Sequence, residues 1–102
     1  MNEEQIPFSD LDRVIHEPAR LLIVTILSTV EQADFLFLLH ETGLTKGNLS
    51  SHLSRLEKSG YVMIEKTYKG KLPMTLCRLT DEGMEAFQQY RQQLDELLSR
   101  GQ

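Results

Sequence analysis

The sequence has little of what disulfide-linked, metal-binding or membrane proteins need. It contains a single cysteine, Cys77, among 102 residues and no tryptophan. One cysteine cannot close an intrachain disulfide, and the three histidines have neither the i, i+4 spacing nor the neighbouring thiolate of a metal site. The longest apolar stretch, residues 21–27, is about a third of a membrane span and is interrupted by Thr25. We therefore expect no metal, no other cofactor and no membrane partner.

Targeting and catalytic motifs are also missing. The acidic first residues are not followed by the apolar core of a signal peptide, and three prolines and six glycines are too few for a disordered or collagenous chain. We expect a single domain over residues 1–102 in a reducing cytoplasm. Because no Ser-His-Asp order, phosphate loop or paired-carboxylate motif occurs, we do not expect an enzyme. We interpret Cys77 as a packed core residue rather than a redox switch.

The charges are unevenly distributed along the chain. The net charge is −4, which by itself argues weakly against nucleic acid as a partner. Residues 46–78, however, hold seven basic residues against two acidic ones, whereas the segments on both sides are acidic. The basic segment is therefore the part of the chain in which we look for an anionic partner.

Apolar residues recur at helical spacing in four consecutive segments. These segments begin near Ser9, Pro18, Asp34 and Thr45. Gly43 and Gly60 are placed to end the third and fourth of them, because glycine readily adopts the left-handed conformation that stops a helix. We therefore predict four helices before residue 60.

After Gly60 the apolar period changes from helical to roughly two. Residues 61–68 and 74–79 predict two strands, and residues 69–73 carry the turn residues between them. Thr80 then caps a last helix over residues 80–100. The sequence predicts a mainly α-helical fold with a small β-hairpin, in which flanking helices precede and follow a helix-turn-helix and its wing.

The predicted helix that begins at Thr45 has two different sides. Leu49, Leu53 and Leu56 fall on one side at 100° per residue. The opposite side is small, polar and basic, and its residues are Gly47, Asn48, Ser51, Ser54, Arg55 and Lys58. Such a face could enter the major groove of DNA, where small residues permit close approach and Asn, Ser and Arg bind base edges or phosphates; it could also be an ordinary solvated surface.

The hairpin decides between these two interpretations. Lys66, Lys69 and Lys71 lie on or near its tip. Lysines there could contact the DNA backbone, or they could merely keep an exposed edge strand soluble. Because a basic helix face and a basic hairpin follow each other directly, we favour double-stranded DNA as the partner.

The segment from Leu44 to Val62, LTKGNLSSHLSRLEKSGYV, resembles the recognition-helix region of MarR-like and ArsR-like winged-helix transcriptional regulators. The LTDEG string at residues 79–83 resembles the opening of the helix that follows their wing. The resemblance implies a dimeric DNA-binding regulator. Carried over by position, it implies that the DNA-binding residues are Thr45, Lys46, Asn48, Ser50, Ser51, His52 and Arg55 on the helix, with Lys69 and Lys71 on the wing.

The chain also departs from these families. It is shorter than full-length MarR proteins and lacks their usual Asp-x-Arg in the wing, so it looks more like the short, single-domain MarR-like proteins. Residues 34–40 contain no cysteine, so the metal sensing of ArsR proteins is not expected.

The last helix is longer than one small core needs, which suggests a second copy of the chain as its partner. The residues that we expect at a homodimer interface are Phe8, Leu11, Ile15, Phe87, Tyr90, Leu94, Leu97 and Leu98. A two-fold dimer would place its recognition helices about one DNA turn apart on a pseudo-palindromic operator.

Two alternatives stay open at this point. The same surface could hold an acidic protein partner, which would make the chain a winged-helix protein-interaction module. A ligand-responsive regulator with an apolar pocket for a small-molecule effector at the dimer interface is the third hypothesis.

Overall fold

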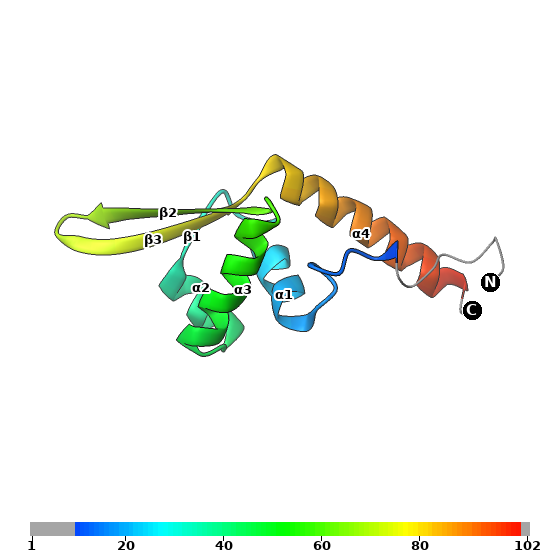
Figure 1. Cartoon of the computed structure of the whole chain (residues 1–102), viewed down its shortest axis with the longest axis horizontal. Coiled ribbons are helices and arrows are strands. Elements are labelled where there is room, and N and C mark those ends of the chain that lie inside the picture. The colour runs from blue at the N-terminus through cyan, green and yellow to red at the C-terminus, as the bar shows by residue number, and fades with distance from the viewer. Residues whose placement is uncertain (1–9, 101–102) are drawn as a thin grey trace.

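The computed structural model describes residues 10–100, which form four α-helices and a three-stranded antiparallel sheet. The elements are α1 (Pro18–Leu27), β1 (Ala33–Asp34), α2 (Phe35–Thr42), α3 (Lys46–Lys58), β2 (Val62–Lys69), β3 (Leu72–Leu79) and α4 (Asp81–Arg100). Helices α1, α2 and α3 gather at the centre, while the β2–β3 hairpin and α4 extend in opposite directions (Figure 1). The molecule is therefore elongated, with extents of 58 × 25 × 21 Å.

The helix boundaries follow from local sequence. Glu17 is extended, as the residue before a proline prefers, and its carboxylate accepts hydrogen bonds from the backbone N–H groups of Ala19 and Arg20. Gly43 ends α2 at φ 69°, in the left-handed region. Both the glycine stop and the proline start match the sequence-based expectation.

The expected first helix near Ser9 is wrong for the described residues, because the chain forms turns and bends between residues 11 and 17. The carboxylate of Asp12 accepts hydrogen bonds from the backbone N–H groups of Val14 and Ile15. These local bonds satisfy the backbone without a helix. Leu11 and Ile15 are nevertheless fully buried, so this segment contributes to the core despite its irregular conformation.

The hairpin is longer and its turn is tighter than expected. Pairing runs from Val62 opposite Leu79 to Lys69 opposite Leu72, and Gly70 and Lys71 alone form the turn. Gly70 has φ 64°, which suits the first central position of a two-residue hairpin turn. Pairing of β2 and β3 therefore extends to the very tip of the hairpin.

Strand β1 was not predicted. Its two residues pair with Cys77 and Leu76 on β3, which makes β3 the central strand in the order β1-β3-β2. A two-residue strand has no recognisable period and depends entirely on the strand beside it. It joins the start of α2 to the base of the hairpin.

One apolar core joins all the elements. The side chains that are at most 2% exposed are Leu11, Ile15, Ile23, Val24, Leu27, Leu38, Leu49, Leu53, Leu56, Val62, Cys77 and Tyr90. No charged or polar side chain of residues 10–100 is buried, and none of their buried side-chain nitrogen or oxygen atoms lacks a hydrogen-bond partner. Within the same residues, no helix has the length and apolar character needed to cross a membrane.

The start of α4 is held against the turn that follows α3. The Thr80 hydroxyl donates to the carbonyl of Gly60 at 2.6 Å and accepts from the N–H of Gly83 at 2.9 Å. The Thr80 N–H donates to the carbonyl of Tyr61 at 3.0 Å. Thr80 thus caps α4 and joins it to the turn that follows α3.

Gly83→Ala should destabilise the protein by about 1–3 kcal/mol, because the backbone of Tyr61 leaves no room for a methyl group. A Cβ at residue 83 would lie 2.2 Å from the Tyr61 carbonyl oxygen. Gly47→Ala is the matched control, since a Cβ at that helical position would meet nothing within 4 Å. We expect Gly47→Ala to be neutral or to stabilise by up to about 1 kcal/mol. Chemical denaturation of both variants measures this, and equal stabilities would contradict the close approach.

Candidate nucleic-acid interface

A short turn between α2 and α3 sets the direction of α3. Gly43 ends one helix, and the Thr45 hydroxyl accepts a hydrogen bond from the N–H of Asn48 at 3.1 Å at the start of the next. Leu38 on α2 and Leu49 on α3 are both fully buried, so the two helices meet in the core. The capped N-terminal end of α3 is therefore exposed at the surface of the molecule.

Burial divides α3 as its sequence period predicts. Leu49, Leu53 and Leu56 are at most 2% exposed. The opposite side, which we call the exposed α3 face, consists of Gly47, Asn48, Ser51, Ser54, Arg55 and Lys58, and Lys46 is exposed on the first turn beside it. This face has no acidic residue, and its side chains at positions 47, 51 and 54 are small.

The cations on and beside the exposed α3 face have no acidic partner. Among residues 10–100, salt bridges join Glu17 to Arg20 and His52, and Glu41 to His40. Lys46, Arg55 and Lys58 take part in none of them. Their charges are therefore available to an external anion.

His52 does not lie on the exposed α3 face, although the resemblance implied a DNA contact there. Its Nδ1 lies 3.2 Å from Arg20 Nη1 and 3.5 Å from Glu17 Oε2. At 100° per residue, position 52 falls on the flank of α3 that meets α1. His52 therefore joins α3 to the start of α1.

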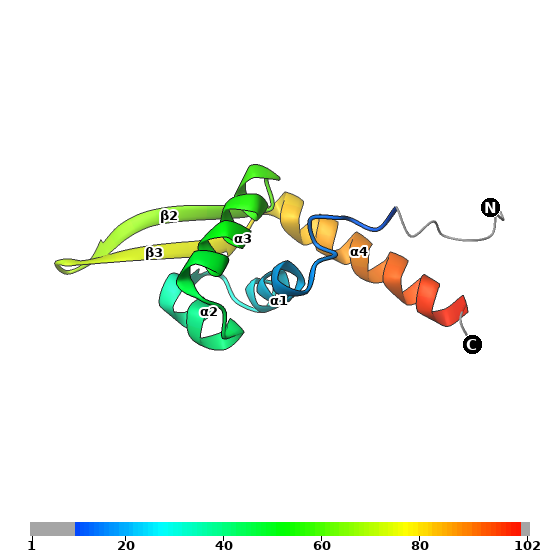
Figure 2. The ribbon, with the colours of Figure 1, turned by 60° about the horizontal axis from the view of Figure 1, so that its bottom comes forward.

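Ser50 lies on the other flank, next to the hairpin. It is exposed and lines a groove of about 530 Å³ between α3 and the hairpin. The residues that line this groove are Phe35, Ser50, Leu53, Ser54, Glu57, Ile64, Lys66 and Thr75. Helix α3 and the hairpin diverge from the turn that joins them, as Figure 2 shows.

The hairpin carries its lysines away from the helical body (Figure 1). Lys69 is the last residue of β2, Lys71 lies in the turn, and Lys66 is farther back on β2. All three are exposed, and none forms a salt bridge with a described residue. The structure thus brings a basic hairpin and a basic helix face into one half of the molecule.

Four of the residues expected at a dimer interface are already covered by their own chain. Leu11, Ile15, Phe87 and Tyr90 are at most 6% exposed. Tyr90 Oη and His16 Nδ1 also share a hydrogen bond of 2.7 Å. These side chains form part of the core, so a second copy could not bury them further; Phe8 lies outside the described residues.

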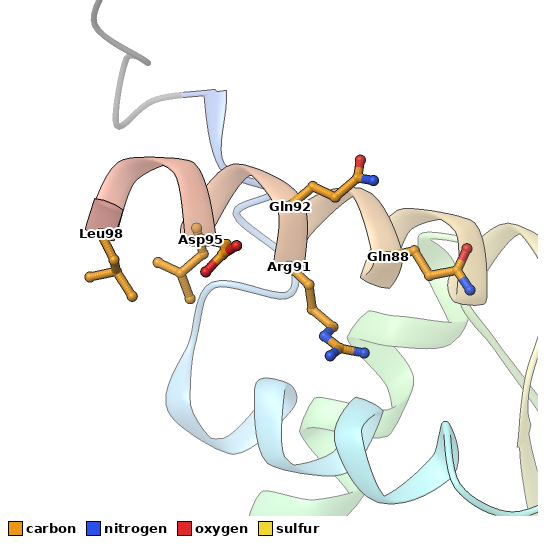
Figure 3. Close-up of a pocket in the computed structure, with 6 residues that line it drawn as sticks. Gln88, Arg91, Gln92, Asp95 and Leu98 are labelled. Atoms are coloured by element: carbon orange, nitrogen blue, oxygen red, sulfur yellow. The ribbon is translucent and has the colours of Figure 1, made fainter. Parts of the chain in front are cut away.

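The second half of α4 is less covered. Leu94 and Leu97 are half-buried, and Leu98 is 63% exposed. A pocket of about 600 Å³ lies along this half of the helix, and Arg91 and Leu98 extend from the same side of it (Figure 3). Gln88, Gln92, Leu94 and Asp95 line the same pocket.

Neither a reactive thiol nor a metal-binding cluster is found in the described chain. Burial raises the pKa of Cys77 to about 11, so this thiol stays protonated at neutral pH. Burial and the hydrogen bond to the Asp12 carboxylate raise the pKa of Tyr61 to about 12, and burial raises the pKa of Tyr90. No group of three His, Cys, Asp or Glu side chains among residues 10–100 could hold a metal ion.

Comparison with known proteins identifies the fold. Residues 19–98 match the family model described as a winged helix DNA-binding domain. The chain belongs to this winged-helix family. In this fold α3 is the recognition helix and the β2–β3 hairpin is the wing, as the sequence predicts.

Known relatives agree with this assignment. A transcriptional regulator homologue from Pyrococcus horikoshii has 31% identity and a TM-score of 0.80, with 84% of this chain and 85% of that chain covered. An uncharacterized protein of Methanocaldococcus jannaschii is 33% identical over 76% of this chain and 85% of its own length.

More distant structures share the fold. A MarR-like transcription regulator from Bacillus cereus has 24% identity and a TM-score of 0.69, with 90% of this chain and 68% of that chain covered. NadR, whose structure was solved in complex with 4-hydroxyphenylacetate, has 22% identity and a TM-score of 0.71, with 88% of this chain and 63% of that chain covered. The expected resemblance to winged-helix transcriptional regulators is confirmed, and the protein is a DNA-binding regulator.

The contact between α1 and the recognition helix should depend on pH through Glu17. Burial opposes ionisation of Glu17, but hydrogen bonds from the backbone of Arg20 and Ala19 and the charges of His52 and Arg20 outweigh it, so its pKa is lowered. A lowered pKa in the folded state stabilises the fold above the usual glutamate range, and this stability is lost as the pH falls.

We expect Glu17→Gln to cost roughly 0.5–1 kcal/mol at pH 7, and much less once the pH has fallen through the lowered pKa of Glu17 and the native carboxyl is protonated. Thermal unfolding across this pH range measures the difference. Glu41→Gln is the control, because its ion pair with the exposed His40 should contribute little at any pH. A constant cost of Glu17→Gln at all pH values would contradict the role of the charge.

Proposed function

We propose that the protein regulates transcription as a homodimer that binds double-stranded DNA at a pseudo-palindromic operator, with α3 in the major groove. The observation that carries this proposal is the exposed α3 face. It is small, polar and basic, it contains no acidic residue, and its two cations and the neighbouring Lys46 form no salt bridge with the described residues. A helix needs such a face to approach base edges between two phosphate strands.

The side chains divide into two roles. Lys46, Asn48, Ser50 and Ser51, on the first turns of α3, are the candidates for contacts with bases, and Thr45 caps this end. Arg55 and Lys58 are one to three turns farther along and would contact phosphates, as would Lys69 and Lys71 on the wing. His52 would act by holding α3 against α1, since its ring already contacts Arg20 and Glu17.

A second copy of the chain is the partner that suits α4. The helix has 20 residues and is therefore about 30 Å long, but its buried large side chains, Phe87 and Tyr90, lie in its first half. Leu94, Leu97 and the exposed Leu98 continue the apolar side along the second half. We propose this second half of α4 as the core of the dimer interface.

Two other hypotheses have less support. Membership of a DNA-binding family makes a purely acidic protein partner the weaker interpretation of the basic surface. NadR resembles this chain only in its fold, so its ligand is not evidence for a ligand here. A small-molecule effector for this chain stays a prediction.

Two substitutions on α3 should affect DNA binding differently. Arg55→Ala should weaken binding to every duplex and lower the slope of log K against log salt by about 0.9, because one phosphate contact is lost. Asn48→Ala should relax sequence preference by about 1–3 kcal/mol if its base contact is bidentate. Sequences selected from a random duplex pool give the preferred site, and gel retardation over a salt series gives both quantities.

Arg100→Ala is the charge-matched control, since Arg100 ends α4 on the side of the molecule away from the wing. We expect it to change neither slope nor preference. Retention of full affinity and unchanged preference in both α3 variants would show that the exposed α3 face does not bind DNA. No retardation of any duplex at low salt would instead favour the protein-interaction module.

Leu98→Asp should convert the dimer into a monomer without unfolding it, because this side chain is exposed in one copy and would be buried between two. Sedimentation velocity at micromolar concentration measures the change in mass. Gln89→Asp is the control, since Gln89 is exposed, does not line this pocket and at 100° per residue falls on the side of α4 opposite Leu98. A wild-type monomer, or identical association of both variants, would refute an interface on this side of α4.

A further inference from the structure

Arg20 is a cation whose charged group is used inside the protein. It lies on the first turn of α1, and its side chain is only 16% exposed. Its Nε–H donates to the carbonyl of Val14 at 2.6 Å, and Nη2 donates to the carbonyl of Arg13 at the longer distance of 3.5 Å. The guanidinium therefore holds the irregular segment that precedes α1.

The remaining edge of the same guanidinium faces the recognition helix. Helices α1 and α3 lie beside each other (Figure 1). Nη1 of Arg20 lies 3.2 Å from Nδ1 of His52 on α3 and 3.8 Å from Oε2 of Glu17. The Glu17 carboxylate is itself held in place, because it caps α1. Arg20 thus joins the irregular segment, the start of α1 and the middle of α3.

His52 is the side chain through which α3 makes polar contact with the rest of the described chain. Among Lys46–Lys58, no other side chain forms a hydrogen bond or a salt bridge with another element of residues 10–100. The buried leucines of α3 pack without directional preference, whereas a hydrogen bond is directional. Asn48 lies one turn nearer the N-terminus than His52. A shift of His52 would therefore also move the turn that we propose for base contacts.

Resting on the proposed function, we propose that Arg20 is a positioning residue for DNA recognition, which fixes the orientation of α3 through His52 and does not itself contact DNA. A planar guanidinium donates toward Val14 and His52 at the same time, which a lysine ammonium on its flexible stem cannot reproduce. Contacts with bases depend on the orientation of α3, whereas non-specific binding depends on charge. Loss of this guanidinium therefore weakens binding to the preferred sequence most.

Arg20→Lys tests this role because the charge is kept. We expect binding to the duplex selected by the wild-type protein to weaken about tenfold, and binding to a random duplex to change by less than about twofold. The slope of log K against log salt should stay the same on both duplexes. Gel retardation measures these quantities under conditions in which chemical denaturation shows the variants to be folded. Arg13→Lys is the matched control that should change nothing, since this exposed side chain forms no hydrogen bond or salt bridge with a described residue.

His52→Ala removes the partner on α3 and does not touch the core, so it tests the contact even if Arg20→Lys folds poorly. We expect the same loss on the selected duplex and the same small change on the random one. Because both substitutions break one contact, the double variant should bind no more than about twofold worse than the weaker single variant. Additive losses would show that the two side chains act separately, and this would overturn the proposal.

The protonation of the His52 ring gives an independent measurement. A guanidinium has no acceptor, so its contact with Nδ1 is a hydrogen bond only when Nδ1 carries no proton. Ring-nitrogen NMR of the wild-type protein, at a pH where the ring is neutral, should show the proton on Nε2. Arg20→Lys should shift the Nδ1 resonance of His52 and leave that of the exposed His40 unchanged. A proton on Nδ1 of the wild-type ring would show that His52 bonds to Glu17 instead, and the role of Arg20 would be lost.

Two further results would overturn this inference. One is wild-type affinity and preference in both Arg20→Lys and His52→Ala. The other is full affinity of Arg20→Lys together with a salt slope lowered by about 0.9 in Arg20→Ala, because this would place the guanidinium on a phosphate. If the wild-type protein retards a duplex and these variants bind it normally, only this inference fails; if the wild-type protein retards no duplex, the proposed function itself has failed.

Discussion

The burial of three leucines on α3 is the constraint on which the rest of this structure depends. Leu49, Leu53 and Leu56 insert into a core that α1, α2, the hairpin and α4 share. With this side fixed by the hydrophobic effect, the helix has no freedom to rotate about its axis, and the small, basic side must face outward. The surface that we propose for DNA binding is therefore a consequence of how α3 packs against the core.

The turn that follows α3 sets the directions of both the wing and α4. Gly60 and Tyr61, which follow α3, receive the hydrogen bonds of Thr80 at the start of α4, and Gly83 approaches the Tyr61 carbonyl closely. The wing leaves this junction in one direction and α4 leaves it in the other (Figure 1). A basic surface and an apolar helix end are thereby separated along the longest axis, so DNA and a second subunit would not compete for the same surface.

A group of polar contacts at residues 12–20 holds the recognition helix from its other flank. Asp12 binds the hydroxyl of Tyr61, and Glu17 and Arg20 contact His52. Arg20 belongs to α1, whereas residues 11–17 have no regular secondary structure and are kept in place by the buried Leu11 and Ile15. Apolar burial here positions polar side chains, which in turn limit the movement of α3 against α1.

Local sequence determined the helices from residue 18 onward, the hairpin and the two sides of α3, because periodicity, caps and glycine stops act over a few residues. The irregular conformation of residues 11–17, the strand β1, the orientation of His52 and the burial of Tyr90 were decided only by tertiary structure. Each of these depends on a partner far away in the chain: Tyr61 for Asp12 in the irregular segment, β3 for β1, Arg20 for His52, and His16 for Tyr90. The groove between α3 and the wing also depends on tertiary structure. The sequence predicts α3 and the hairpin separately, but it does not predict the angle at which they diverge from the turn that joins them.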